Sequence, residues 1–346
     1  MTPEAEPGTE HEHHEEAILD HALRNHAYEV EPVVLDADAA SGDIQGTPAE
    51  MYQAPAGNPG FPAHDAPLQP ALIASPLLPR LIPNLGHTIL FFLLALVTMG
   101  VGEVLGVLLL EQTHLFGHHS FQDISRMSTG DARLTLPIQA LSYALVAVVV
   151  IPVFGLWWRE PFSEGVHWNA FAARQRTLRL ALTGVALGFG IGAFGNFLPM
   201  PKDPPIMHDM MKSSLGAWLM LAFGVTAAPL LEELAFRGFL LPSLINSFRW
   251  LGRKSVMSET AARWIGVPIS ILITSAGFAY MHSPQVSHAW GPLVLIGSVS
   301  IVLCIVRLAM NSVAAGVVVH AAYNFTLFAG MLAQTGGFRH LDRLTT

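Results

Sequence analysis

The sequence predicts an all-α membrane protein, a polytopic transmembrane helix bundle of seven to eight spans with a disordered N-terminal tail. Two observations predict this fold. Hydrophobic residues make up 51% of the 346 residues and charged residues only 13%, whereas soluble domains carry about 25% charged residues. The apolar residues also form runs of about 20 residues, which is the length that crosses a bilayer.

The negative charge is concentrated near the N-terminus. Residues 1–86 contain 14 Asp and Glu against 2 Lys and Arg, a net charge of −12, whereas residues 87–346 contain 12 acids and 16 bases, a net charge of +4. Segment 1–84 is rich in Pro, Ala and His, and such a composition buries too little apolar surface to fold. It also lacks the basic and apolar regions of a signal peptide.

We therefore expect residues 1–84 to form a solvated tail without a nucleic-acid partner. A short helix is predicted at about 15–28, and a histidine cluster in the tail is a weak candidate for metal binding. The cluster consists of His11, His13 and His14.

Seven apolar runs predict the spans of a transmembrane domain over residues 85–346. The fourth run is too long for one straight span, and Pro229 predicts a break or bend just before two glutamates. If that run forms two pieces, the number of spans rises to eight. The runs are roughly 87–110, 134–158, 177–198, 215–247, 264–283, 291–310 and 312–334.

The third run carries small residues on one face. Gly184, Gly188 and Gly192 follow one another at intervals of four residues. Small residues at this spacing let the backbones of two membrane helices approach closely. We expect this face to pack tightly against a neighbouring helix.

Basic residues in the loops predict the orientation. Loops rich in Lys and Arg remain in the cytoplasm, and the second and fourth loops are the richest. With seven spans, this places the N-terminus in the cytoplasm, in an integral protein of the plasma (cytoplasmic) membrane. The residues are Arg159, Arg174, Arg176 and Arg179 in the second loop and Arg249, Arg253, Lys254 and Arg263 in the fourth.

Two adjacent carboxylates and an arginine lie within the fourth run. Charges at membrane depth are costly unless they are paired or hydrated. Glu233 and Arg237 are four residues apart, so they share a helix face and can pair. Glu232 points about 100° away and is free to face a cavity. Glu103 stands alone in the first run, where we expect a packing or hydration role.

Two later runs repeat the four-residue spacing with other polar groups. Phe278 and His282 lie in the fifth run, and His320 and Asn324 lie in the seventh. Three helices therefore each project a compact pair from one face, and a shared buried pocket is the simplest destination. A carboxylate removed from bulk water is a usable general base, and histidine and amide N–H groups can stabilise an oxyanion. This inventory describes peptide hydrolysis within a membrane.

At these residues the chain resembles the CPBP family, which is the CAAX protease and bacteriocin-processing (Abi) family and includes the type II CAAX prenyl endopeptidases. The family's three signatures are Glu-Glu-x-x-x-Arg, Phe-x-x-x-His and His-x-x-x-Asn. Here they read "EELAFR" (232–237), "FAYMH" (278–282) and "HAAYN" (320–324), and Gly238 also fits. The similarity covers about 215–330, which we take as the core of the protease domain.

The resemblance implies a role for each motif residue. Glu232 would activate the attacking water and His282 would position it. His320 and Asn324 would stabilise the oxyanion. The implied catalytic set is Glu232, Glu233, His282, His320 and Asn324, with structural support from Arg237 and Phe278.

The resemblance leaves the metal question open, because the family has been described both as metalloproteases and as metal-free glutamate proteases. A glutamate and two histidines can hold Zn²⁺ in principle. This sequence has no His-Glu-x-x-His helix, however, and Asn324 suits an oxyanion site better than a zinc site. We expect no metal, with zinc as the alternative.

The implied function is an intramembrane endopeptidase that cleaves a membrane-associated peptide or protein, either a prenylated CAAX protein or a leader peptide. One alternative is a non-catalytic immunity or scaffold protein of the same fold, which would have no need of Glu232. A second is a proton-coupled transporter, since buried Glu and His also mark proton pathways. The lack of an evident inverted repeat argues against a transporter.

A shared site requires the three helices to bring their groups to one depth. Counting 1.5 Å per residue from the predicted inner edges at Arg249, Arg263 and Asn311 places Glu232 and His282 about 25 and 28 Å deep, but His320 only about 14 Å deep. These depths overlap only loosely. We nevertheless expect the side chains of Glu232, His282 and His320 within about 8 Å of each other, close enough to share one or two waters.

Overall fold

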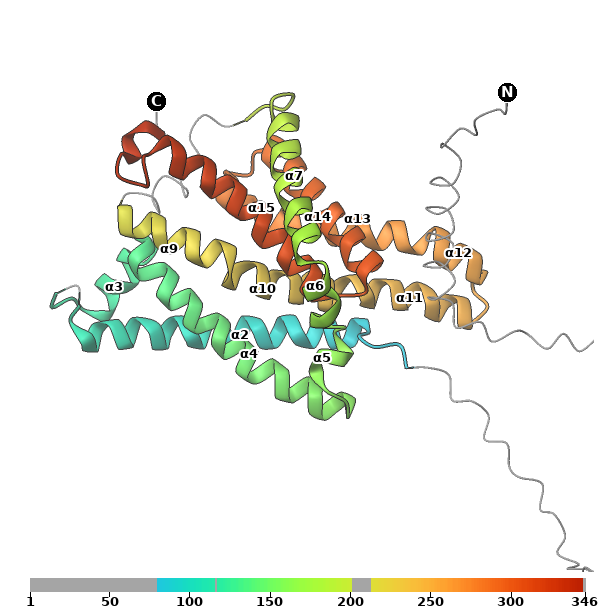
Figure 1. The fold of residues 1–346 in the computed structure, drawn as a ribbon. Coiled ribbons are helices and arrows are strands. Elements are labelled where there is room, and N and C mark those ends of the chain that lie inside the picture. The colour runs from blue at the N-terminus through green and yellow to red at the C-terminus, as the bar shows by residue number, and fades with distance from the viewer. Residues whose placement is uncertain (1–79, 116, 201–212, 345–346) are drawn as a thin grey trace, which may run out of the picture. The chain divides into compact units, whose positions relative to one another are not determined.

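Figure 1 shows the computed structural model of the chain, which describes residues 80–115, 117–200 and 213–344. These residues form helices joined by turns, without any β-strand among them, and the predicted all-α class is confirmed. They belong to one compact unit, Pro76–Thr346. The predicted tail helix and the histidine cluster lie outside the described residues.

Seven segments of the described chain are long and apolar enough to cross a membrane, which confirms the predicted spans. The fourth is one helical run of 40 residues, so it counts as a single span. The spans are α2 (Leu85–Thr113), α4 (Ala132–Trp158), α7 (Thr177–Gly195), the run Ser214–Arg253, α12 and α13 together (Glu259–Met281), α14 (Trp290–Met310) and α15 (Val313–Gln334). Shorter elements are α3 (Phe121–Met127), α5 (Phe162–Gly165), α6 (Ala170–Gln175), η3 (Ser283–Val286) and η4 (Leu341–Leu344).

Large apolar side chains cover the outside of the spans. Leu96, Leu156 and Tyr280 are between 71% and 80% exposed. Apolar surface on this scale marks a membrane or protein interface, and lipid chains solvate it without cost. The chain is therefore an integral membrane protein.

The glycine face of α7 packs on α15. A Cβ atom at Gly184 would lie 2.7 Å from the Cβ of Ala322, and one at Gly188 would lie 2.9 Å from Thr326. Gly192 has no such neighbour within 4 Å. The predicted close packing is confirmed for Gly184 and Gly188. It is wrong for Gly192, which lies beyond the part of α7 that contacts α15. α7 thereby fixes the helix that carries the His-x-x-x-Asn motif.

The fourth span breaks once before its glutamates. α9 (Ser214–Val225) ends at Thr226, where φ and ψ of −126° and −81° interrupt the helix, and α10 (Ala227–Glu233) follows. The predicted break at Pro229 therefore lies three residues too late. The reason is that proline fits the first turn of a helix, where its missing N–H would have had no partner.

The same span then widens into a π-helix, η2 (Leu234–Leu240), before α11 (Leu241–Arg253). The N–H of Leu241 donates to the carbonyl of Phe236, five residues back. Pro242 follows at once, and a proline ring inside an α-helix collides with the carbonyl four residues back. The wider turn relieves this collision. π-Segments are rare and often lie at functional sites, and the apolar pattern of this run did not predict this one.

Aromatic rings hold η2 in place. Phe239 stacks on Phe91 of α2 with centroids 4.4 Å apart, and Phe236 meets Phe278 of α13 edge to face at 5.1 Å. Such ring pairs add about 0.5–1.5 kcal/mol each beyond burial. The motif-bearing segment is thus fixed against two other spans.

Candidate active site

Three helices bring the predicted site residues together. Glu232 lies in the last turn of α10, His282 caps the C-terminus of α13, and His320 lies in the first half of α15. The Oε2 atom of Glu232 is 3.9 Å from Nε2 of His282 and 3.7 Å from Nε2 of His320. The predicted proximity of these three side chains is confirmed.

Glu232 stays accessible at the centre of this cluster. Its side chain and that of His282 are each 15% exposed, and that of His320 is 5% exposed. Both nitrogen–oxygen distances are longer than a hydrogen bond. A water molecule between the groups can reach the carboxylate and both rings within normal hydrogen-bond lengths.

Glu233 has a different environment, because its carboxylate is fully buried. Its Oε1 atom lies 3.0 Å from Nη1 of Arg237 and 3.0 Å from Nδ1 of His320. Arg237 is also fully buried, and its Nη2 donates to the hydroxyl and carbonyl oxygens of Ser300 at 2.8 and 3.1 Å. The predicted Glu233–Arg237 pair is therefore present. It orients the His320 ring through Nδ1, while Nε2 of this ring faces Glu232.

Phe278 supports both the arginine and a histidine. The guanidinium carbon of Arg237 lies 4.6 Å from the Phe278 ring centroid, within the range of a cation–π interaction. The carbonyl of Phe278 lies 2.8 Å from Nδ1 of His282. The Phe-x-x-x-His motif therefore fixes its own histidine through the main chain.

These contacts define the proton positions on the rings. A carbonyl or carboxylate oxygen only accepts, so Nδ1 of His282 and Nδ1 of His320 each carry a hydrogen. In the neutral rings, both Nε2 lone pairs then face Glu232. His320 can donate from Nε2 only when it is protonated on both nitrogens.

Asn324 lies one turn beyond His320 but has its own partner. Its Nδ2 atom donates to the carbonyl of Gly224 in α9 at 2.7 Å. This bond uses one of the two amide hydrogens. Asn324 therefore ties α15 to α9 and has one hydrogen left for a ligand.

Three residues near the site escaped the sequence analysis. Ser300 of α14 accepts from Arg237, and Arg307 of the same helix donates to the carbonyl of Arg237 at 3.1 Å. A Cβ atom at Gly316 would lie 2.6 Å from Oε2 of Glu233. Arg307 was visible as a charge in an apolar run, whereas a serine and a glycine give no signal in a membrane helix.

The histidines share one feature with zinc ligands, since their Nδ1 atoms are held by oxygen partners. However, the described part of the chain contains no group of three or more His, Cys, Asp or Glu side chains arranged to hold a metal ion.

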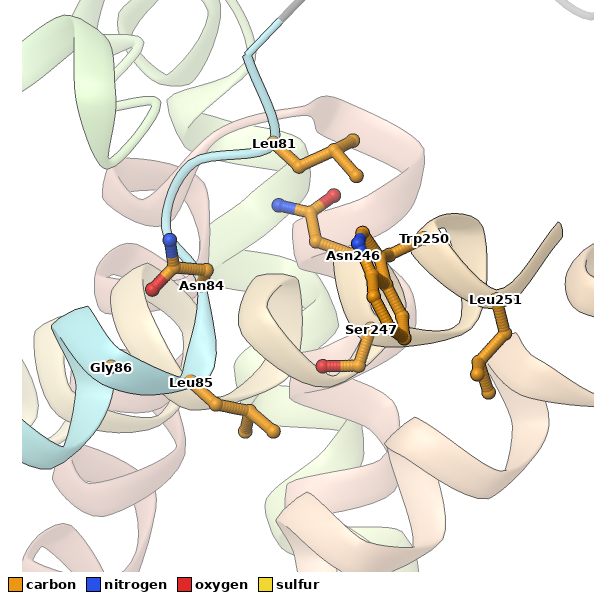
Figure 2. Close-up of a pocket in the computed structure, with 8 residues that line it drawn as sticks. All are labelled: Leu81, Asn84, Leu85, Gly86, Asn246, Ser247, Trp250 and Leu251. Atoms are coloured by element: carbon orange, nitrogen blue, oxygen red, sulfur yellow. The ribbon is translucent and has the colours of Figure 1, made fainter. Parts of the chain in front are cut away.

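A separate pocket of about 480 Å³ lies between the start of α2 and α11 (Figure 2). Its lining includes Asn84, Asn246 and Trp250, without an ionisable side chain. It therefore offers no acid–base chemistry, and the candidate site remains the Glu232 cluster.

The fold and cluster define a polytopic membrane protein in which three helices bring a carboxylate and two histidines together. Residues 214–326 match the family model described as Type II CAAX prenyl endopeptidase Rce1-like. This segment contains all three motifs, and the resemblance to the CAAX protease family is confirmed over these residues. No curated protein and no solved structure matches the chain.

Proposed function

We propose that this protein is an intramembrane endopeptidase in which Glu232 activates the water that cleaves a membrane-associated substrate. One observation supports this most directly. Of two adjacent glutamates, Glu233 is paired with Arg237, whereas Glu232 faces two imidazole nitrogens at 3.7 and 3.9 Å. The match of residues 214–326 to the family model supports a CAAX-type protease at the coarser level.

In the proposed first step, the Glu232 carboxylate takes a proton from water as the oxygen attacks the scissile carbonyl carbon. The lone pair on Nε2 of His282 accepts a hydrogen bond from the second O–H of this water, which stays on the oxygen, and orients the water. The C–O bond that forms converts the carbonyl into a tetrahedral oxyanion. General-base assistance of this kind contributes about 10²–10⁴-fold in rate.

The oxyanion requires donors on the opposite side of the carbonyl. The Nδ1–H of His320 donates to Glu233. His320 therefore serves as an oxyanion donor in its doubly protonated form, in which Nε2 also carries a hydrogen. The second amide hydrogen of Asn324 is the other candidate donor. Glu232 then delivers its proton to the leaving nitrogen as the C–N bond breaks, and the carboxylate returns to its starting state.

The proposed substrate is a peptide segment that reaches the site from the bilayer. Either a prenylated CAAX terminus or a leader peptide fits, because both are held at a membrane before cleavage. We place the protein in the plasma membrane with a cytoplasmic N-terminus, as the distribution of basic loop residues favours.

A comparison of membrane proteomes tests this function. Cells with wild-type protein and cells with Glu232→Ala should differ in one or more membrane-associated proteins, which accumulate uncleaved in the variant. Identical proteomes would favour a non-catalytic scaffold. The identified terminus also decides between a prenylated and a leader-type substrate.

The proposed reaction uses no metal, and metal analysis tests this point. We expect prolonged treatment with EDTA or phenanthroline to leave cleavage unchanged and the purified protein to contain well below one zinc per chain. Loss of zinc together with activity, and recovery of both on zinc addition, would establish a metalloprotease instead.

A further inference from the structure

Arg307 is a buried arginine that lies outside the three motifs. It lies in the last turn of α14 and is only 4% exposed. Its Nε donates to the main-chain carbonyl of Arg237 at 3.1 Å, and its Nη1 donates to Oδ1 of Asn311 at 3.1 Å. No carboxylate of the described chain lies within ion-pair distance of it. A buried charge without a counter-charge is costly, so its position requires an explanation.

The carbonyl of Arg237 needs a donor because of the helix type. In η2 the N–H of Leu241 already donates to the carbonyl of Phe236, five residues back. The same register assigns the Arg237 carbonyl to residue 242, which is Pro242 and has no N–H. A buried carbonyl without a donor is destabilising, and the Nε–H of Arg307 donates to this carbonyl.

Helix α14 therefore contacts both the guanidinium group and the main-chain carbonyl of Arg237. Ser300 accepts from the guanidinium, and Arg307 donates to the backbone of the same residue. The two α14 residues are seven positions apart, which places them on one helix face. Arg237 in turn positions Glu233, which holds the Nδ1–H of His320.

We infer that Arg307 is a positioning residue for the proposed proteolysis, acting by replacing the backbone donor that Pro242 removes. It maintains the π-register of η2 and thereby the placement of Glu232 and Glu233. This inference rests on the proposed function for its kinetic consequence, but its structural consequence stands without it.

The test uses Arg307→Met, which removes the donor and keeps a long side chain, and a double variant that adds Pro242→Ala. The alanine supplies an N–H at position 242. Two controls separate other causes. Asn311→Gly removes only the second bond of Arg307 and tolerates the φ of 44° found there, and Arg263→Met removes an exposed arginine elsewhere.

Two readouts are measured in lipid nanodiscs: hydrogen exchange of the amides of residues 234–241, and cleavage of a quenched fluorescent peptide ending in a farnesylated Cys-aliphatic-aliphatic-X box. We expect Arg307→Met to exchange at least tenfold faster and to lose about 10- to 100-fold in kcat with KM within twofold, as for a small misplacement of catalytic groups. The double variant should recover most of the exchange protection and most of the kcat. The controls Asn311→Gly and Arg263→Met should resemble wild type in exchange and in kcat.

Wild-type exchange and kcat in Arg307→Met would overturn the inference. So would a double variant that exchanges as fast as Arg307→Met, or an Asn311→Gly variant that reproduces the loss. If wild-type protein does not cleave the farnesylated peptide, the prenylated-substrate form of the proposed function fails, while the exchange comparison still decides the role of Arg307.

Discussion

Glu232 and Glu233 are adjacent in the chain, yet their carboxylates have different partners. Glu233 is fully buried between Arg237 and His320, whereas Glu232 is 15% exposed and lies beside two histidine rings. One helix step of about 100° separates the two directions. At the scale of single residues, this separation supports the proposed roles, with Glu233 as the supporting carboxylate and Glu232 as the general base.

Arg237→Ala should destabilise the membrane domain. It leaves the Glu233 carboxylate buried without its counter-charge, which costs about 3–5 kcal/mol. We expect the melting temperature of detergent-solubilised protein to fall by several degrees. Arg133→Ala is the matched control, because its pair with Asp131 at 2.6 Å is solvent-exposed and should matter little. Unchanged melting with lost activity would instead place Arg237 in the catalytic group.

Gly316→Ala should disturb the site from the neighbouring helix. The added methyl carbon would lie 2.6 Å from Oε2 of Glu233, and that carboxylate cannot move away without losing Arg237 or His320. We expect peptide cleavage to fall at least tenfold. Gly330→Ala on the same helix is the control, since no such atom lies within 4 Å of it. Equal activities of the two variants would contradict this packing argument.

At the scale of elements, the fourth span shows how its local sequence determines its shape. Pro229 sits in the first turn of α10, and Pro242 follows the π-helix η2. The two prolines thus bracket the Glu-Glu-x-x-x-Arg motif with two helix irregularities. α13 and α15 complete the site by contributing His282 and His320. α7 packs against α15 through Gly184 and Gly188.

Gly184→Ala should loosen the contact between α7 and α15. Its methyl would lie 2.7 Å from Ala322 and closer still to the main chain of α15, so the helices must separate. We expect a lower melting temperature and reduced cleavage, because α15 carries His320. Gly192→Ala adds the same methyl where no atom lies within 4 Å and should melt like wild type. A Gly184→Ala variant as stable as Gly192→Ala would refute the close contact.

The sequence made the spacing within each helix predictable but not the contacts between helices. The spans, the Glu233–Arg237 pair and the direction of Glu232 about 100° away from that pair follow from apolar run length and from 3.6 residues per turn. The depth count placed His320 about 11 Å shallower than Glu232 and about 14 Å shallower than His282, because such a count ignores helix tilt, which is set by packing against neighbours. Ser300 and Gly316 were missed for the same reason.

At the scale of the whole membrane domain, alternate loops meet on one side. Ser312, after α14, donates to the carbonyl of Asn169, after α5, and Asn246 of α11 donates to the carbonyl of Pro83, before α2. Seven spans place these segments on the same face of a membrane. The loops with the most Lys and Arg belong to this side, which favours a cytoplasmic location.

Cysteine labelling tests this topology. Cys304 is the only cysteine and is buried, so Cys304→Ala gives a background for Val256→Cys and His340→Cys. An impermeant maleimide should label His340→Cys in intact cells and Val256→Cys only after permeabilisation, because the two positions lie after the fourth and seventh spans. Labelling of both in intact cells would contradict seven spans, and the reverse pattern would invert the orientation.

The turnover of Glu232→Gln tests the central claim most directly. The amide keeps the size of the side chain but cannot take a proton from water, so we expect cleavage to fall about 10²–10⁴-fold with unchanged melting. Glu103→Gln changes an exposed glutamate of α2 in the same way and should cleave like wild type. The substrate is the farnesylated peptide, or the protein identified by proteomics, in lipid nanodiscs. A Glu232→Gln protein that retains more than about a tenth of wild-type turnover would contradict the general-base role.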